Sequence, residues 1–236
     1  MTILDWIQAG YFLISTRETP WHDGQLLPQR VVTASNCIVD CFPDTRLLPP
    51  ANSPGSDHDE LRSRLQLHED EYSGLLAWID SVWSAERFGP PGVFFSLDDA
   101  REFCHRFLGK IEAQTRLIGL SLDSALVTEY EEALCRAGVV TKLLRLDPLA
   151  PGGKRLGFDV LGEDAYDPEV FHTFSCNGLE KAYSEILGIS FNEHGLIEEY
   201  PAAVAACDYT TRDEVGAEPA AWFPFRIDEY ALYTAD

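Results

Sequence analysis

Short apolar runs alternate with amphipathic segments along the middle of the chain, and this alternation limits the possible folds more than any other feature of the sequence. The runs at residues 93–95, 117–122 and 154–161 have the length and composition of single strands. Residues 97–108 and 126–134 instead repeat apolar side chains at steps of three and four, as amphipathic helices do. This order of segments predicts an α+β (mixed α/β) fold in which strands and helices alternate around one sheet.

Residues that cap helices stand where the predicted helices begin. Ser96 and Asp99 have the spacing of a capping box, and Asp123 precedes the second helix. A third helix is predicted at residues 179–187, with Asn177 as its N-cap and a glutamate three residues later completing the box. A glycine follows each predicted helix, where a left-handed residue commonly ends it.

Weaker patterns extend this interpretation toward both ends of the chain. Aromatic and β-branched residues at 11–15 and 31–42 predict two opening strands, and the periodicity of residues 61–83 predicts one or two helices. Alternating aromatic and aliphatic residues predict a last strand at residues 223–227. Because Pro224 has no amide hydrogen to donate, we expect this strand at an edge of the sheet.

The length of 236 residues and the apolar content of 45% suit a single folded domain covering residues 1–236. Residues 43–56 carry four prolines and cannot continue a helix or a central strand, so an irregular connection is expected there. The sequence leaves the oligomeric state open.

The charge balance excludes several classes of partner. The 39 acidic and 18 basic residues give a net charge of −21, which repels phosphate backbones and anionic lipid headgroups. The first residues lack the layout of a secretory signal, and no apolar run approaches the ~20 residues of a membrane span. We therefore expect a cytoplasmic protein that binds neither nucleic acid nor membranes, with its six cysteines reduced and mostly buried.

No spacing typical of a phosphate-binding loop, a nucleophile elbow or a zinc site occurs in the chain. The one pair that suggests catalysis is His172 and Cys176, because a cysteine before a helix start can have a lowered pKa and a nearby imidazole can act as its base. The strand expected at residues 171–175 separates the two side chains, however. We expect no catalytic residue, no bound metal and no cofactor; the alternative is an enzyme, either a cysteine hydrolase at this pair or a magnesium-dependent enzyme at an acidic cluster.

Negative charge is concentrated in the last third of the chain. Residues 151–236 hold 17 acidic and 5 basic residues, and aromatic residues lie between the acids. Carboxylates that steer a partner and aromatic side chains that anchor it would suit an interface for a basic protein, whereas in a generally acidic protein the same aromatics would form core. The candidate partner-binding residues are Glu163, Asp164, Glu198, Glu199, Tyr209, Asp213, Glu214 and Trp222.

The sequence Gly-Phe-Asp-Val-Leu-Gly at residues 157–162, the sequence Phe-His-Thr-Phe-Ser-Cys-Asn-Gly-Leu-Glu at residues 171–180 and the acidic tail resemble bacterial immunity proteins of polymorphic toxin systems. The resemblance covers about residues 157–236. It implies a cytosolic, acidic protein without enzymatic activity, which inhibits one cognate basic toxin by covering its active site. Such interfaces differ from pair to pair, so the resemblance assigns no contact residue.

Overall fold

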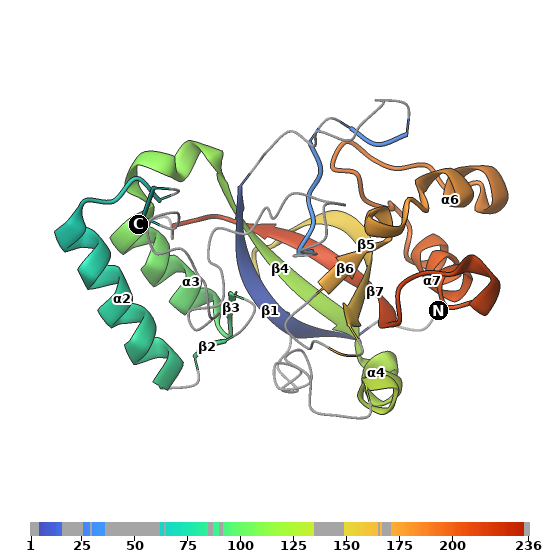
Figure 1. The fold of residues 1–236 in the computed structure, drawn as a ribbon, viewed down its shortest axis with the longest axis horizontal. Helices are drawn as coiled ribbons and strands as arrows, with labels where there is room; N and C mark the ends of the chain where they lie inside the picture. Colours follow the sequence, from blue (N-terminus) through green and yellow to red (C-terminus); the bar gives the residue numbers. More distant parts are fainter. Residues whose placement is uncertain are drawn as a thin grey trace.

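The described residues form an antiparallel sheet of seven strands that runs through the centre of the molecule (Figure 1). The computed structural model describes residues 5–15, 26–28, 30–35, 62–63, 65–84, 87–89, 92–134, 149–164, 166 and 171–233. The strands are β1 (Trp6–Ser15), β2 (Phe88–Gly89), β3 (Val93–Phe94), β4 (Thr115–Asp123), β5 (Lys154–Asp164), β6 (Phe171–Thr173) and β7 (Ala220–Tyr230). Their order across the sheet is β2-β3-β1-β4-β7-β5-β6, and every pair is antiparallel.

Helices follow the strands in the predicted alternation, so the α+β fold class is confirmed. The longer ones in the described part of the chain are α2 (Glu69–Ser84), α3 (Leu97–Phe103), α4 (Val127–Leu134), α6 (Glu180–Leu187) and α7 (Tyr200–Thr210). Shorter helical turns are η1 (Cys104–Leu108), η2 (Gly109–Gln114), η3 (Ser124–Leu126), η4 (Phe174–Asn177) and η5 (Asp213–Val215). None of the helices among these residues is long and apolar enough to cross a membrane.

Two of the predicted caps are present. The Ser96 hydroxyl accepts a hydrogen bond of 3.1 Å from the Asp99 amide at the start of α3. The Asp123 carboxylate accepts one of 3.1 Å from the Ala125 amide and so begins η3, which leads directly into α4.

The helices pack differently against the two faces of the sheet. On one face a single apolar cluster includes Ile118 and Phe225 of the sheet and Tyr130 of α4. On the opposite face there are two clusters, and Figure 1 shows the helices of each at either end of the sheet. Helices α2 and α3 cover the end formed by β1, β3 and part of β4, whereas α6 and α7 cover the end formed by β5 and the start of β7.

The last strand does not lie at an edge, so the prediction drawn from Pro224 is wrong. Strand β7 is central, between β4 and β5, and Pro224 pairs with Val160 of β5. The pairing with β4 covers only the part of β7 from Arg226 to Tyr230. Pro224 therefore lies beyond that ladder, where its missing amide hydrogen interrupts no bond to β4.

Two local predictions fail because long-range contacts replace local ones. Residues 31–35, expected in a strand, form no strand but are buried, and the Val32 amide donates to the His194 carbonyl over 2.9 Å. Asn177 does not cap α6, which begins at Glu180 without a side-chain cap. The Asn177 carboxamide oxygen instead accepts a hydrogen bond of 3.0 Å from the Glu218 amide. Residues 36–42 and the proline-rich connection at residues 43–56 lie outside the described residues.

Candidate functional site

The eight candidate partner-binding residues have very different exposures. Glu163 and Trp222 are only 1% and 4% exposed, so the structure places both side chains in the interior rather than at the surface where a partner was expected to bind. Asp164 and Tyr209 are half-buried. The remaining four are exposed: Glu198, Glu199, Asp213 and Glu214.

The alternation of side chains along a strand explains why Glu163 is buried whereas its neighbour Asp164 is only half-buried. Adjacent residues in β5 point to opposite faces of the sheet. Glu163 points to the face covered by α4, where the buried Tyr130 hydroxyl donates to its carboxylate. Trp222 lies on the other face, across the sheet from Gly162, where the absence of a side chain leaves room for the indole ring.

The exposed acids gather around α7. Residues 180–218, all of which are described, contain seven exposed carboxylates and two exposed basic residues. The seven are Glu185, Glu193, Glu198, Glu199, Asp208, Asp213 and Glu214; they lie in α7 or in the segments before and after it along the chain, and we call them the α7 acidic surface. Because α7 has 11 residues and rises 1.5 Å per residue, it is about 16 Å long, and the two predicted pairs lie before its start and after its end.

The acids at the two ends of α7 differ in their effect on the helix. Glu198 and Glu199 precede its first turn, where negative charge is favourable by about 0.3–1 kcal/mol. Asp208 lies in the last turn, which contains no basic residue, and Asp213 and Glu214 follow shortly after. Negative charge there opposes the helix dipole, so these three carboxylates do not stabilise α7.

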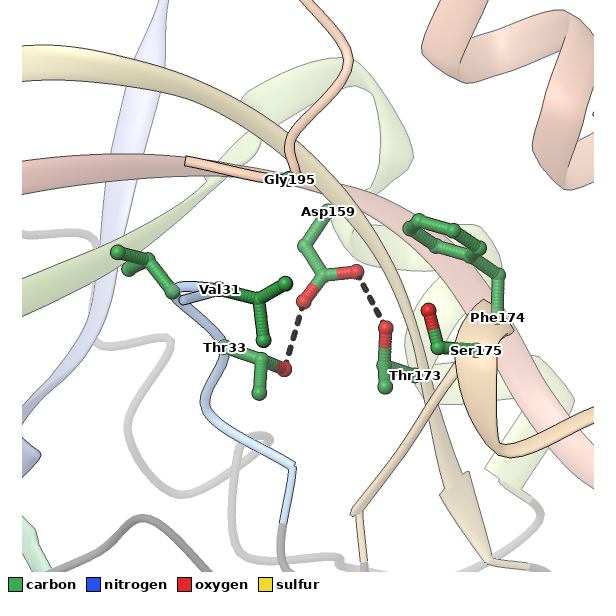
Figure 2. Close-up of a pocket in the computed structure, with 8 residues that line it drawn as sticks. Val31, Thr33, Asp159, Thr173, Phe174, Ser175 and Gly195 are labelled. Carbon is green, nitrogen blue, oxygen red and sulfur yellow. Dashed lines mark hydrogen bonds between the residues drawn. The ribbon is translucent and has the colours of Figure 1, made fainter. Parts of the chain in front are cut away.

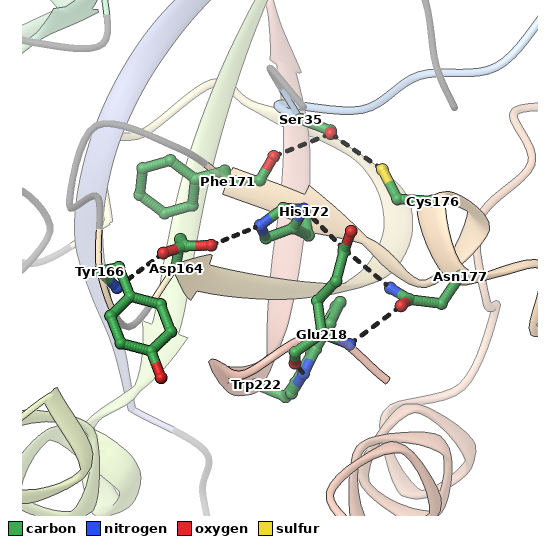
Figure 3. A network of polar contacts seen from close by, with 9 residues as sticks. All are labelled: Ser35, Asp164, Tyr166, Phe171, His172, Cys176, Asn177, Glu218 and Trp222. Carbon is green, nitrogen blue, oxygen red and sulfur yellow. Dashed lines mark hydrogen bonds and ion pairs between the residues drawn. The ribbon is translucent and has the colours of Figure 1, made fainter. Parts of the chain in front are cut away.

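A second feature is a buried imidazole held between two carboxylates (Figure 3). His172, at the edge strand β6, is 5% exposed; its Nε2 lies 3.1 Å from Asp164 Oδ2 and its Nδ1 lies 2.9 Å from Glu218 Oε2. The Asn177 side chain and the Trp222 indole both bond to Glu218. Each ring nitrogen faces one carboxylate oxygen, so His172 of β6 contacts both β5 and the segment before β7.

Figure 3 also shows that the side chains of His172 and Cys176 contact different partners. The Cys176 thiol lies 3.5 Å from the Ser35 hydroxyl, whereas both nitrogens of His172 face carboxylates. Cys176 also lies within η4 rather than at the start of α6, so no long helix directs its N-terminus at the thiol. The contacts shown by the structure therefore do not form the cysteine–histidine dyad of the alternative hypothesis.

Replacing His172 with leucine should destabilise the protein by about 2 kcal/mol, because the partly exposed carboxylates of Asp164 and Glu218 would lose the imidazole that lies between them. Adding Glu218→Gln to His172→Leu should recover part of that loss, since it removes one of the two repelling charges. Urea unfolding of both variants measures the effect. If His172→Leu unfolds at the same urea concentration as the parent, the imidazole does not hold these segments together.

A third feature is the buried carboxyl of Asp159, in the middle of β5 (Figure 2). Thr33 Oγ1 donates to it over 2.8 Å and Thr173 Oγ1 over 2.7 Å. Burial raises its pKa from the ordinary 3.8 to about 7, although the threonine hydroxyls and the Val160 amide act against the shift. The carboxyl borders a cavity of about 10 Å³, which is room for one water molecule and too little for a substrate. Asp159 therefore joins residues 31–35 and β6 to β5.

Sequence reasoning missed Asp159, although a lone aspartate in the apolar run at residues 156–161 was a usable signal. A charged residue in a fully buried strand needs hydrogen-bond donors from elsewhere in the fold. Its two hydroxyl partners lie 126 and 14 residues away along the chain. No local pattern could identify the more distant one.

The chemistry available in the described residues is limited to these features. Across them, no three histidine, cysteine, aspartate or glutamate side chains are placed to hold a metal ion. Cys104, Cys176 and Cys207 are buried, and burial raises the pKa of Cys104 and of Cys207 to about 12. Comparisons of the chain with protein-family models, with curated proteins and with solved structures find no match.

Proposed function

We propose that this protein is an acidic, cytoplasmic binding protein that captures a basic protein partner, and that the partner is a toxin domain whose active site it covers. The α7 acidic surface supports the proposal: seven exposed carboxylates against two basic residues. Lys181 lies 3.8 Å from Glu185, and Arg212 lies against the Tyr209 ring; with both bases counted, the exposed charges of residues 180–218 still sum to −5, seven negative against two positive. The resemblance of residues 157–236 to immunity proteins points the same way.

The C-terminal end of α7 is the preferred centre of this interface. Asp208 in the last turn opposes the helix dipole, and Asp213 and Glu214 follow shortly after it, so three exposed carboxylates are concentrated at this end of α7. Tyr209 is half-buried beside them, with its ring edge-on to Tyr183. A partly exposed tyrosine next to steering charges is a typical anchor of a protein interface.

The double substitution Asp213→Lys and Glu214→Lys should slow association with the partner about tenfold, because the steering field over this end of α7 is reversed. Raising the salt concentration should slow association of the parent protein as well, since the Debye length falls from ~30 Å at 0.01 M to ~8 Å at 0.15 M. The matched control is Asp70→Lys with Asp80→Lys on the exposed side of α2, at the far end of the sheet (Figure 1). Its association rate should stay near that of the parent.

The measurement begins with affinity capture of basic proteins from the source cells, followed by stopped-flow mixing of the purified partner with each variant. Co-expression should also restore growth to cells that produce the captured partner. The proposal would be contradicted if no basic partner is recovered. It would also be contradicted if the association rate changes neither with salt concentration nor with charge reversal at Asp213 and Glu214.

A further inference from the structure

Three buried polar side chains and one half-buried arginine cross the middle of the sheet on the face that carries α2, α3, α6 and α7. Gln8 of β1 pairs in register with Ser121 of β4, and Ser121 pairs with Arg226 of β7. Cross-strand partners share a face, and so do residues two apart in one strand, which adds Asp228 to the row. Gln8, Ser121 and Asp228 are 5%, 0% and 0% exposed. We call Gln8, Ser121, Arg226 and Asp228 the central polar row.

The row separates the two apolar clusters on this face. On one side are Tyr11, Leu117 and Tyr230, which pack with α2 and α3. On the other side are Phe158 and Trp222, which pack with α6 and α7. The centre of the sheet face is thus polar where apolar packing would otherwise be continuous.

Part of the row is satisfied internally. The Gln8 carboxamide nitrogen donates to the Gly10 and Leu120 carbonyls over 2.9 and 2.7 Å, which determines the orientation of the amide group. The Arg226 guanidinium donates to Asp228 Oδ1 over 2.7 Å and lies against the ring of Trp6.

One atom of each side chain in the row is nevertheless left without a hydrogen-bond partner. The four atoms are Gln8 Oε1, Ser121 Oγ, Arg226 Nε and Asp228 Oδ2, all of them inaccessible to bulk solvent. They make up two thirds of the six such atoms in the described residues, so they are concentrated in this one place. An unsatisfied buried polar atom costs about 1–3 kcal/mol, and four in one row require an occupant.

We infer that an ordered water molecule is bound in the central polar row, above Ser121. Gln8 Oε1 and Asp228 Oδ2 are acceptors that need two hydrogens, whereas Arg226 Nε and Ser121 Oγ can each donate one. Water supplies two hydrogens and two lone pairs, so it matches this set. A bare cation would face the N–H donor of Arg226 and the O–H donor of Ser121, and an anion would face the Asp228 carboxylate, so neither ion matches the set. Ser121 is the shortest side chain of the row and pairs with both Gln8 and Arg226, so we place the water at its hydroxyl.

Two measurements test the inference on the whole chain. A crystal structure of the parent should show a water within hydrogen-bond distance of Ser121 Oγ and at least one of the other three atoms. Water-oxygen magnetic relaxation dispersion should count one long-lived internal water fewer in Ser121→Val, whose methyl groups occupy the site, than in the parent. The control Ser190→Val changes an exposed serine and should keep the count.

Ser121→Ala tests the same inference if Ser121→Val does not fold, because it removes one hydrogen-bond partner of the water without adding volume. It should retain the water on whichever of the other three atoms bind it, and its unfolding equilibrium constant should rise less than that of Ser121→Val, for which about tenfold is expected. A parent structure in which the Ser121 hydroxyl bonds directly to Gln8 Oε1 with no water beside it would overturn the inference. An unchanged water count in folded Ser121→Val would do the same.

Discussion

Replacing Asp159 by asparagine should make the protein more stable than its parent at about pH 8 and give it little or no advantage at about pH 4. The folded-state pKa of this carboxyl, about 7, lies above its ordinary value of 3.8. Between these values the folded protein keeps a proton that the unfolded chain has lost, so the free energy of unfolding falls as the pH rises. The full cost, about 4 kcal/mol for a shift of this size, is present above pH 7 and absent below the unfolded pKa.

Asparagine cannot ionise, so the difference in unfolding free energy between the variant and its parent should grow with pH across this window. Urea denaturation at a series of pH values measures that difference directly. Asp80→Asn, which removes an exposed carboxyl from α2, controls for the change in net charge. A difference that stays constant with pH would mean that Asp159 does not titrate in the folded protein near neutrality.

A companion variant isolates the hydrogen bonds that hold this carboxyl. Thr173→Val removes the donor that lies 2.7 Å from Asp159 Oδ1. Because bonds to a charged group contribute about 1.5–3 kcal/mol, the loss should be larger at about pH 8, where the carboxylate is ionised, than at about pH 5. The two variants should therefore respond to pH in opposite directions.

Truncating Trp222 to alanine should destabilise the fold by about 3–5 kcal/mol, which is typical of a large aromatic removed from a core. Trp222 is 4% exposed, its indole nitrogen donates to the Glu218 carbonyl over 3.2 Å, and its own carbonyl accepts from the Cys207 thiol over 3.0 Å. Thermal or urea unfolding measures the loss. Trp222→Phe keeps most of the apolar volume, so it should lose much less.

This result would distinguish a core residue from the partner anchor expected from the sequence. Gly162→Ala provides a second view, because a Cβ at that position would lie 2.8 Å from the indole and must displace it. We expect it to cost about 1–3 kcal/mol as an overpacked site. A Trp222→Ala protein as stable as the parent would show instead that the side chain is free to serve an interface.

Local patterns in the sequence were sufficient for most of the secondary structure. Strands β3, β4 and β5, helices α3 and α4 and the caps at Ser96 and Asp123 all lie where the periodicity and the capping residues predict them. Each depends on contacts between residues a few positions apart, which a single sequence displays. The acidic character of the exposed residues around α7 was also readable, because most acidic side chains remain in water wherever the fold places them.

The order of the strands and the fate of individual polar residues were decided only by tertiary structure. Pro224 lies in a central strand because β4 pairs with a different part of β7. Glu163 and Asp164 are neighbours in sequence, yet α4 covers one and not the other. Asp159 is tolerated in a buried strand because Thr33 arrives from a distant segment. In each case the deciding contact joins residues that are far apart along the chain, and the energy of such a contact leaves no periodic mark in the sequence.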